Sequence, residues 1–257
     1  MFAIERIRII KNILIKDHKA SVTKLSEMLD VTEVTIRRDL EKLENEGFLK
    51  RTHGGAVLYD YVEDTIWENT EEIKDIQSYQ EIADTALYLV NDGDAVMLTN
   101  GTVNTFIAKA LTSHSNLTVV TNDMLIASAF AHSPTNNLIL LGGDLDENAL
   151  YGQMTIDNLR NFSFDHIFIE IDGLSETVGM TVSSTKKATL IQQAIKLADS
   201  VTVVCPSNYF GTKSLYRVGN LNIAHRILTD SKLEDKYKNY IYSNNVPLFT
   251  SIDVYEN

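Results

Sequence analysis

The sequence predicts an α/β protein in which a small N-terminal winged helix-turn-helix precedes a larger, mostly parallel α/β sheet domain. Residues 21–45 hold two short amphipathic segments, and from residue 81 onward short apolar segments alternate with segments of helical periodicity. With 257 residues, of which 44% are hydrophobic, the chain can build a small module and a core of roughly 170 to 180 residues. We therefore expect the winged helix-turn-helix over residues 1–58, a linker over 59–80 and the sheet domain over 81–257.

The helices of the module are marked by capping residues and by apolar residues at helical spacing. Ser21 can cap one helix and Thr32 the next, and only Asp30 and Val31 separate the two. So short a connection makes the helices cross at a steep angle, as in a helix-turn-helix. The apolar stripes are Ile4, Ile7, Ile10 and Leu14 in an N-terminal helix, Val22, Leu25 and Leu29 in the first capped helix, and Ile36, Leu40 and Leu43 in the second.

The second capped helix is expected to present a pair of arginines to solvent. At about 100° per residue, the stripe that contains Ile36 packs inward, Val34 and Arg38 point away from it, and Thr35 and Arg37 flank them. On an arbitrary helix an arginine pair is a solvated surface. The N-terminal residues of the second helix of a helix-turn-helix, however, meet base edges in the major groove. This position favours DNA reading over a plain solvated surface.

A short basic hairpin is expected after this helix. Gly47 supplies a stop, Phe48 and Leu49 resume an apolar pair, and the run Lys50-Arg51-Thr52-His53-Gly54-Gly55 follows. A Gly-Gly tip can approach a phosphate backbone closely because glycine has no Cβ. We interpret this hairpin as the wing.

The stretch TIRRDLEKLENEGFLKRTHGGAV, residues 35–57, is similar to the signature of the DeoR family of bacterial transcriptional regulators. That family couples this recognition helix to an Arg-x-His-Gly-Gly-Ala wing. The resemblance implies a sequence-specific transcriptional regulator with double-stranded operator DNA as its partner, and repression of carbohydrate metabolism genes is the habit of the family. The matching positions are Thr35, Ile36, Arg37, Arg38, Asp39, Leu40, Leu43, Gly47, Arg51, His53, Gly54, Gly55 and Ala56.

The resemblance assigns base reading and phosphate contact to the recognition helix and the wing. A carboxylate that faced a phosphate would oppose it. We therefore expect Asp39 to hold a neighbouring arginine in its rotamer and Glu41 to lie beyond the groove. The residues expected to contact DNA are Ser21, Thr32, Val34, Thr35, Arg37, Arg38, Arg51, His53 and Gly54.

The charge distribution supports the same division of the chain. Residues 1–58 carry 11 Lys and Arg against 9 Asp and Glu, whereas the rest of the chain carries 12 against 26. The overall net charge of −12 discourages non-specific coating of nucleic acid, so affinity for DNA should come from a small patch and fall steeply with salt. Cys205 is the one cysteine and is expected to be a buried strand residue. No apolar run has transmembrane length, so we expect a cytoplasmic protein without a membrane partner.

The alternation in the larger domain predicts a parallel sheet covered on both faces. Helices are expected over residues 81–90, 103–112, 124–131 and 187–198, and strands over 95–99, 117–121, 137–141, 166–171, 201–205, 226–229 and 247–250. Ligands of such sheets bind outside the carboxyl ends of the strands.

The loops at those carboxyl ends are the candidate effector site. Asn100, Gly101 and Thr102 bridge a strand end and a helix start, so free N–H groups and a hydroxyl could face an anion there, although a plain strand-to-helix turn has the same sequence. The residues expected to bind the effector are Asn100, Gly101, Thr102, Asn122, Gly142, Gly143, Asp172, Gly173, Ser207 and Tyr209. The scattered histidines lack metal-ligand spacing and no dinucleotide fingerprint is present, so neither a metal nor a cofactor is expected.

In the DeoR family this domain resembles ribose-phosphate isomerases and usually senses a phosphorylated sugar. Here the chain departs from the family. An Asp-Ser-Gly-Thr-Thr loop is replaced by residues 99–103, with Thr99 at the Asp, and an Asp-Ser-Ser-Lys-Phe-Gly loop by residues 206–211, with Pro206 at the Asp and Tyr209 at the Lys. These departures put the usual effector in doubt.

Three functions therefore stay open. The first is a repressor whose small-molecule effector differs from the common sugar phosphates or binds through other groups. The second is a DNA binder whose second domain only oligomerises. The third is a sugar-phosphate isomerase-like enzyme, which needs a carboxylate and usually a lysine on the sugar; the departures remove the obvious candidates, so we expect no enzymatic activity. A single winged helix contacts too little DNA for operator affinity, so a homodimer or homotetramer is expected.

Overall fold

The computed structural model describes residues 3–17, 19–45, 48–52, 54–58, 75–131 and 133–250. The chain divides into two compact units, Met1–Lys74 and Asp75–Asn257. Each unit is built around its own hydrophobic core. We call the first the DNA-reading unit, after the function expected of it from the sequence, and the second the sheet unit.

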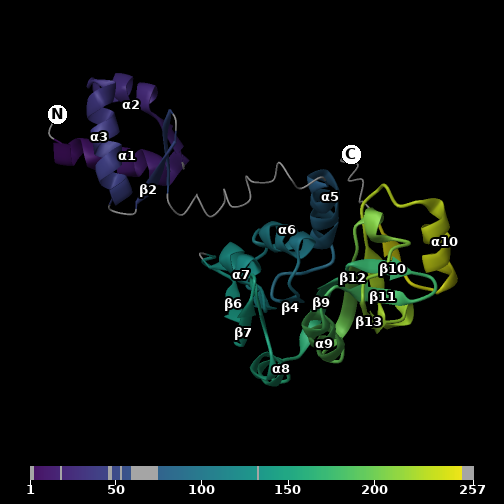
Figure 1. Ribbon diagram of the computed structural model, residues 1–257. Helices are drawn as coiled ribbons and strands as arrows, with labels where there is room; N and C mark the ends of the chain where they lie inside the picture. Colours follow the sequence, from purple (N-terminus) through teal and green to yellow (C-terminus); the bar gives the residue numbers. More distant parts are fainter. Residues whose placement is uncertain are drawn as a thin grey trace. The chain divides into compact units, whose positions relative to one another are not determined.

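In its described residues, the DNA-reading unit combines α-helices with a small antiparallel sheet (Figure 1). In chain order its elements are α1 (Ala3–Asp17), β1 (Lys19–Ser21), α2 (Val22–Leu29), α3 (Glu33–Asn45), β2 (Leu49–Thr52) and β3 (Gly55–Leu58). The strand order is β1-β3-β2, so the wing hairpin is extended by the segment that leads into α2. The sequence pattern did not predict β1.

The core of this unit combines most of the predicted apolar stripes with two residues of the hairpin, whereas Ile7 is only partly buried and the side chain of Ile4 lies outside those described. The buried side chains are Ile10, Leu14, Val22, Leu25, Leu29, Ile36, Leu40, Leu43, Leu49 and Ala56. The predicted cap of α2 is confirmed, because the amide of Lys24 donates to Ser21 Oγ over 3.1 Å. Asp30 ends α2 in the left-handed region with φ of 51°, which turns the chain sharply enough for α3 to follow after a short connection.

The sheet unit is a seven-stranded, all-parallel sheet with the order β15-β14-β12-β9-β4-β5-β6. Its strands are β4 (Ala95–Leu98), β5 (Thr118–Thr121), β6 (Asn137–Leu140), β9 (Phe164–Glu170), β12 (Ala198–Val204), β14 (Arg226–Leu228) and β15 (Leu248–Phe249). The fold class and the seven predicted strands are therefore confirmed. Cys205 is buried, as expected, but it directly follows β12 and is not part of the strand.

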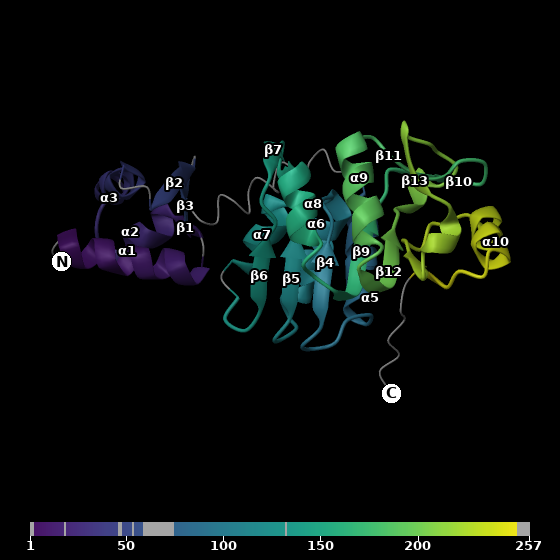
Figure 2. The same ribbon diagram turned by 90° about the horizontal axis from the view of Figure 1, so that it is seen from below.

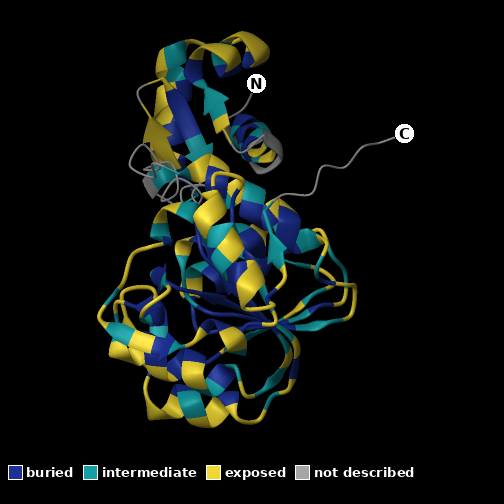
Figure 3. Ribbon diagram, turned by 90° about the vertical axis from the view of Figure 1, so that its right-hand side faces the viewer, coloured by how far each residue is buried: buried dark blue, intermediate teal, exposed yellow. Residues whose placement is uncertain are grey.

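Helices cover both faces of the sheet (Figures 1 and 2). On one face lie α5 (Ile76–Leu87), α6 (Thr102–Leu111) and α7 (Met124–Phe130), and on the other lie α8 (Gln153–Leu159) and α9 (Thr185–Ala194). Alternate strand residues face the two layers: Val96, Leu98 and Phe168 pack with α5 to α7, whereas Met97 and Ile167 pack with α8 and α9. Figure 3 shows the strands as the buried middle of this sandwich.

Several elements of this unit were not predicted. They are α8, the hairpin of β7 (Asp144–Asp146) and β8 (Ala149–Tyr151), the antiparallel sheet of β10 (Gly173–Ser175), β11 (Gly179–Val182) and β13 (Tyr216–Gly219), and α10 (Asp235–Ser243). The helix expected from residue 81 begins at Ile76, so residues 76–80 of the expected linker are helical. Residues 59–74 of that linker lie outside the described residues.

Candidate functional sites

The outward face of α3 carries the residues predicted to read DNA. Val34 is 62% exposed, Arg37 and Arg38 are exposed, and Thr35 is half-buried. Opposite them, Ile36, Leu40 and Leu43 are fully buried. The predicted orientation of the helix is therefore confirmed: its two arginines face solvent.

The turn before α3 is braced by side chains and backbone. Ser26 accepts the amide of Val31 at its carbonyl oxygen over 3.2 Å and donates its hydroxyl back to Val31 O over 2.7 Å. Thr32 accepts the amide of Thr35 at Oγ1 over 3.4 Å and shares a 3.0 Å hydroxyl contact with Thr35. Thr32 therefore caps α3 as predicted, and its hydroxyl is already engaged in the free protein.

One arginine of α3 and one of the wing border the same hollow. Arg37 binds Glu33 with 3.3 Å between Nη2 and Oε2, and Arg51 binds Glu44 with 2.6 Å between Nε and Oε2. Both ion pairs are partly exposed to water, and ion pairs in water contribute little to the stability of the fold. The hollow between the recognition helix and the wing is lined by Val22, Arg37, Leu40, Arg51, Thr52 and Gly55.

Asp39 does not hold an arginine of the recognition helix. Its carboxylate accepts two hydrogen bonds from Arg6 of α1, with 2.5 Å to Nε and 3.1 Å to Nη2, and both side chains are buried. The expectation for Asp39 is therefore wrong in its partner, because the contact joins α3 to a residue 33 positions away in the chain. The pair joins the middle of α3 to α1, while Glu41 is exposed.

The two glycines of the wing differ in what surrounds them. A Cβ at Gly55 would overlap the carbonyl oxygen of Ala20, so this glycine allows β3 to lie against β1. Nothing lies within 4 Å of a Cβ placed on Gly54. Only Gly54 therefore leaves space for a phosphate backbone to come close, which was expected of both glycines. His53, which was also expected to contact DNA, lies outside the described residues.

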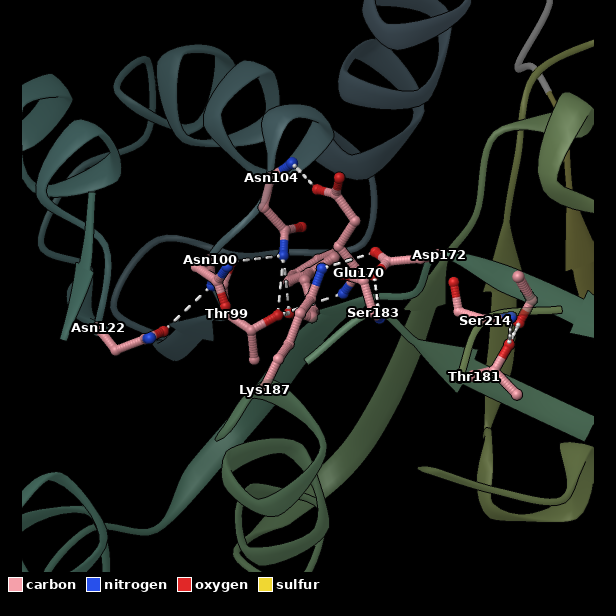
Figure 4. A network of polar contacts seen from close by, with 12 residues as sticks. Thr99, Asn100, Asn104, Asn122, Glu170, Asp172, Thr181, Ser183, Lys187 and Ser214 are labelled. Atoms are coloured by element: carbon pink, nitrogen blue, oxygen red, sulfur yellow. Dashed lines mark hydrogen bonds and ion pairs between the residues drawn. The ribbon is translucent and has the colours of Figure 1, made fainter. Parts of the chain in front are cut away.

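The second candidate site lies at the carboxyl edge of the seven-stranded sheet (Figure 4). The loops after β4, β5 and β9 bring Asn100, Asn122 and Asp172 close to Glu170, the last residue of β9, and the first turn of α9 adds Lys187. We call this set the sheet-edge network. It contains three of the residues expected to bind an effector, together with two that the sequence argument missed.

Glu170 occupies the N-terminus of α6. The amide of Asn104 donates to Glu170 Oε2 over 2.9 Å, and a Cβ at Gly101 would overlap the same carboxylate. Burial raises the pKa of Glu170 to about 7, although the charge of Lys187 and the amides of Asn104 and Val103 lower it. Glycine at position 101 is thus required by an internal carboxylate, which already accepts the amide of Asn104 at the start of α6.

Asp172 and Lys187 form the ion pair of this network. Lys187 Nζ lies 2.9 Å from Asp172 Oδ1, and Asp172 Oδ2 accepts the amide and hydroxyl of Ser183 over 2.6 and 2.7 Å. Burial would raise the pKa of Asp172, but Lys187 and Ser183 together hold it below its usual value. The lysine charge is therefore already matched by a carboxylate.

Three asparagines, Asn100, Asn104 and Asn122, complete the polar contacts around the charged residues of the network. Asn122 accepts the amide of Asn100 at Oδ1 over 3.1 Å and donates Nδ2 to Leu150 O over 3.1 Å. Asn104 donates Nδ2 to the carbonyl oxygens of Thr99 and Phe168 over 2.8 and 3.1 Å. The Oδ1 atoms of Asn100 and Asn104 are buried and lack a hydrogen-bond partner among the described residues.

Asp123 is a further buried carboxylate beside the network. It caps α7 by accepting the amides of Leu125 and Ile126 at Oδ1 over 2.7 and 3.2 Å. Burial raises the pKa of Asp123, and hydrogen bonds that include the amide of Gly101 lower it. A second amide at the start of α6 therefore has an internal partner.

The remaining residues expected to bind an effector are placed differently. Thr102 is exposed on the first turn of α6, and Tyr209 is half-buried, with burial and the charge of Glu170 raising its pKa. Ser207 gives its amide and hydroxyl to the buried Asp230 over 2.7 and 2.8 Å. The three glycines expected to bind an effector, other than Gly101, are explained by close packing against their neighbours. A Cβ would meet Met154 at Gly142, Tyr151 O and Thr155 at Gly143, and Thr181 and Thr212 at Gly173.

Sequence reasoning missed Glu170, Lys187, Asn104, Asp123 and Asp230. Glu170 was counted as part of an apolar strand, and Lys187 as part of an amphipathic helix. The usable signal was their position, because a charged residue at the last position of a buried parallel strand faces the ligand edge. The departures at Thr99, Pro206 and Tyr209 therefore do not leave this edge without a lysine or a carboxylate.

The described residues include neither a membrane-spanning helix nor a metal-binding cluster. No helix there is long and apolar enough to cross a bilayer. No group of three or more His, Cys, Asp or Glu residues there is arranged to hold a metal ion.

Comparison with known proteins matches both units to one family. Residues 6–62 match the model of the DeoR-like helix-turn-helix domain, and residues 74–231 match that of the DeoR C terminal sensor domain. The chain is 32% identical over 236 residues to the HTH-type transcriptional regulator YulB of Bacillus subtilis, covering 91% of each chain. It is 26% identical to the glycerol-3-phosphate regulon repressor of Escherichia coli, covering 82% of this chain and 84% of that one. Among solved structures, ribose 5-phosphate isomerase A of Methanocaldococcus jannaschii matches 55% of each chain with 13% identity and a TM-score of 0.38.

Proposed function

This chain belongs to the DeoR family of transcriptional regulators, and we propose that it represses carbohydrate metabolism genes by binding operator DNA under the control of a small carbohydrate effector. The observation that carries the DNA-binding part is the exposed face of α3, with Arg37 and Arg38 outward and with Arg37 and Arg51 bordering one hollow between helix and wing. A duplex that places α3 in its major groove meets base edges with that face.

We assign the arginines separate parts. Arg37 and Arg38 lie near the N-terminus of α3, where side chains reach base edges, and a bidentate arginine discriminates between bases by about 1 to 3 kcal/mol. Arg51 lies on β2, where it faces the phosphate backbone beside the groove. Arg37 and Arg51 are each paired with a partly exposed carboxylate, and such pairs contribute little to stability, so DNA can replace the carboxylate at little cost. The base edges would compete with Glu33 for Arg37, and the phosphates with Glu44 for Arg51.

The effector part of the proposal is supported by the sheet-edge network. Buried charged groups with shifted pKa values gather at ligand sites, and the network lies where ligands of parallel sheets bind. Control of DNA affinity requires that the effector bind the DNA-competent and DNA-incompetent arrangements unequally. A homodimer or homotetramer would present two or more copies of α3 to repeated half-sites.

The test is selection of genomic DNA fragments by the full chain at near-physiological salt. Wild type is compared with the Arg37→Ala, Arg38→Ala variant, and with an Arg8→Ala, Arg160→Ala variant that removes the same charge from exposed positions elsewhere. Wild type and the control should enrich the same few fragments with repeated half-sites, and the α3 variant should lose them. Equal enrichment by all three proteins would contradict the proposal.

A further inference from the structure

The N-terminus of α6 is the place in the sheet unit where an anion would be expected, and the chain fills it with its own carboxylates. Glu170 Oε2 accepts the amide of Asn104 over 2.9 Å, and the carboxylate lies where a Cβ of Gly101 would be. Asp123 takes the amide of Gly101, and Asn122 Oδ1 takes that of Asn100 over 3.1 Å. A phosphate group at this position would have to displace Glu170.

The charge around the position disfavours such an exchange. Glu170, Asp172 and Asp123 are carboxyl groups within one cluster, and the positive charge that acts on Glu170 is Lys187, which already binds Asp172. A phosphate monoester would add up to two negative charges to a buried site that is acidic in sum. Its oxygens are also hydrogen-bond acceptors, and this part of the site already consists of acceptors.

The buried atoms at this site that lack a hydrogen-bond partner are acceptors, so they favour a ligand that carries hydrogen-bond donors. Asn104 is 0% exposed, and its Oδ1 has no hydrogen-bond partner among the described residues. Its orientation is fixed, because Nδ2 is held by two carbonyl oxygens. In Figure 4 the free Oδ1 faces the side on which Glu170, Lys187 and Asp172 lie. Asn100 offers a second unpartnered Oδ1 nearby. Buried acceptors without donors are costly unless a ligand supplies them.

We propose that the effector is a polyhydroxylated carbohydrate that donates its hydroxyl groups to Asn104, Asn100, Glu170 and Asp172, and that Glu170 excludes phosphate from the N-terminus of α6. The inference rests on the proposed effector-sensing function. It makes Glu170 a specificity-determining residue, since its carboxylate both accepts a ligand hydroxyl and holds the anion position closed.

The test is calorimetric titration of the full chain at pH 8 with inorganic phosphate and with matched pairs of compounds. Each pair is an unphosphorylated hexose, ketose, pentitol, hexitol or hexosamine and its phosphomonoester. The proteins are wild type, Glu170→Ala, which empties the position, and Glu170→Gln, which keeps its shape without the charge. Asp199→Ala is the matched control, because Asp199 is an exposed carboxylate at the start of β12, away from the carboxyl edge.

Wild type and Asp199→Ala should bind at least one unphosphorylated compound more tightly than its phosphomonoester and should not bind inorganic phosphate. Glu170→Ala should gain inorganic phosphate affinity by roughly tenfold or more, with a smaller gain for Glu170→Gln. If a hexosamine binds and its neutral parent hexose does not, the ligand donates an ammonium group and the polyhydroxyl assignment is overturned.

Two further results would overturn the inference. One is a wild type that prefers the phosphomonoester. The other is a folded Glu170→Ala variant, verified by its circular dichroism spectrum, with no gain for phosphate. Because none of these titrations contains DNA, their failure is separate from a failure of operator selection, which would instead remove the proposed function.

Discussion

The two units of this protein use charge in opposite ways. In the DNA-reading unit the proposed functional cations, Arg37 and Arg51, are exposed and held by partly exposed carboxylates. In the sheet unit Glu170 and Lys187 are buried at 7% and 6% exposure, and each acts on the pKa of its neighbours. Water screens the first set, so those residues can exchange partners easily. The second set is barely screened, and any ligand that enters must match its charge and hydrogen bonds.

The prediction with the largest expected effect concerns the buried ion pair described in the DNA-reading unit, Arg6 with Asp39. Asp39→Ala removes the carboxylate that accepts two hydrogen bonds from the buried guanidinium of Arg6. We expect the free energy of unfolding of this unit to fall by about 3 to 5 kcal/mol. The measurement is hydrogen–deuterium exchange of the α1 and α3 amides in the full chain. Glu41→Ala, an exposed change on the same helix, is the control, and an equal effect of the two substitutions would contradict the expectation.

The next test concerns Glu170 and pH. Its folded-state pKa is raised to about 7, whereas an unfolded glutamate titrates near 4.3. Between about pH 4.3 and 7 the folded state keeps a proton that the unfolded state has released. The contribution of Glu170 to stability is therefore fully present below about pH 4.3 and is lost as pH rises through 7.

Glu170→Gln removes this dependence. We expect the difference in free energy of unfolding between variant and wild type to shift by on the order of 3 kcal/mol between pH 4.5 and pH 8, with the variant gaining at pH 8. Urea unfolding at both pH values measures it. Asp172 contributes little to this shift, because its lowered pKa and the ordinary pKa of an unfolded aspartate both lie below pH 4.5. A pH-independent difference would show that Glu170 titrates as an ordinary exposed carboxylate.

The same contrast explains which features could be predicted from sequence. The proposed DNA-contacting face of the DNA-reading unit lies along one helix, so helical spacing alone places Val34, Arg37 and Arg38 outward and Ile36 inward. The parallel strands were predicted from short apolar runs, because a strand covered on both faces must be apolar throughout. In both cases the signal is local in the chain.

The sheet-edge network has no such local signal. Asn104 and Glu170 touch across 66 positions of sequence, and Lys187 reaches Asp172 from the next helix. The strand ends were predicted as the ligand edge, but the sequence did not reveal that the amides of α6 were already occupied. Asp39 shows the same limit in the smaller unit, because its partner Arg6 is distant in the chain. Which charges meet depends on tertiary packing.

A smaller effect distinguishes the proposed base reader from the proposed phosphate contact. Arg37→Ala should reduce discrimination between operator and scrambled DNA by about 1 to 3 kcal/mol. Arg51→Ala should weaken binding to both sequences alike and lower the salt slope by about 1. Fluorescence anisotropy at several salt concentrations gives both quantities. If Arg51→Ala instead removed discrimination, the wing would read sequence and the two roles would be reversed.

The smallest effect is expected from the carboxylate that competes with DNA for Arg37. Glu33 accepts Arg37 Nη2 over 3.3 Å and the hydroxyl of Thr23 over 2.9 Å. Because the ion pair is exposed, replacing Glu33 with Gln should cost the free protein less than about 1 kcal/mol, while it frees Arg37 and removes a negative charge beside the duplex. Operator affinity should therefore rise slightly, and the rise should shrink at high salt. A loss of affinity would mean that Glu33 orients Arg37 for the bases, and the exposed pairs of this unit would then hold geometry much as the buried pairs of the sheet unit do.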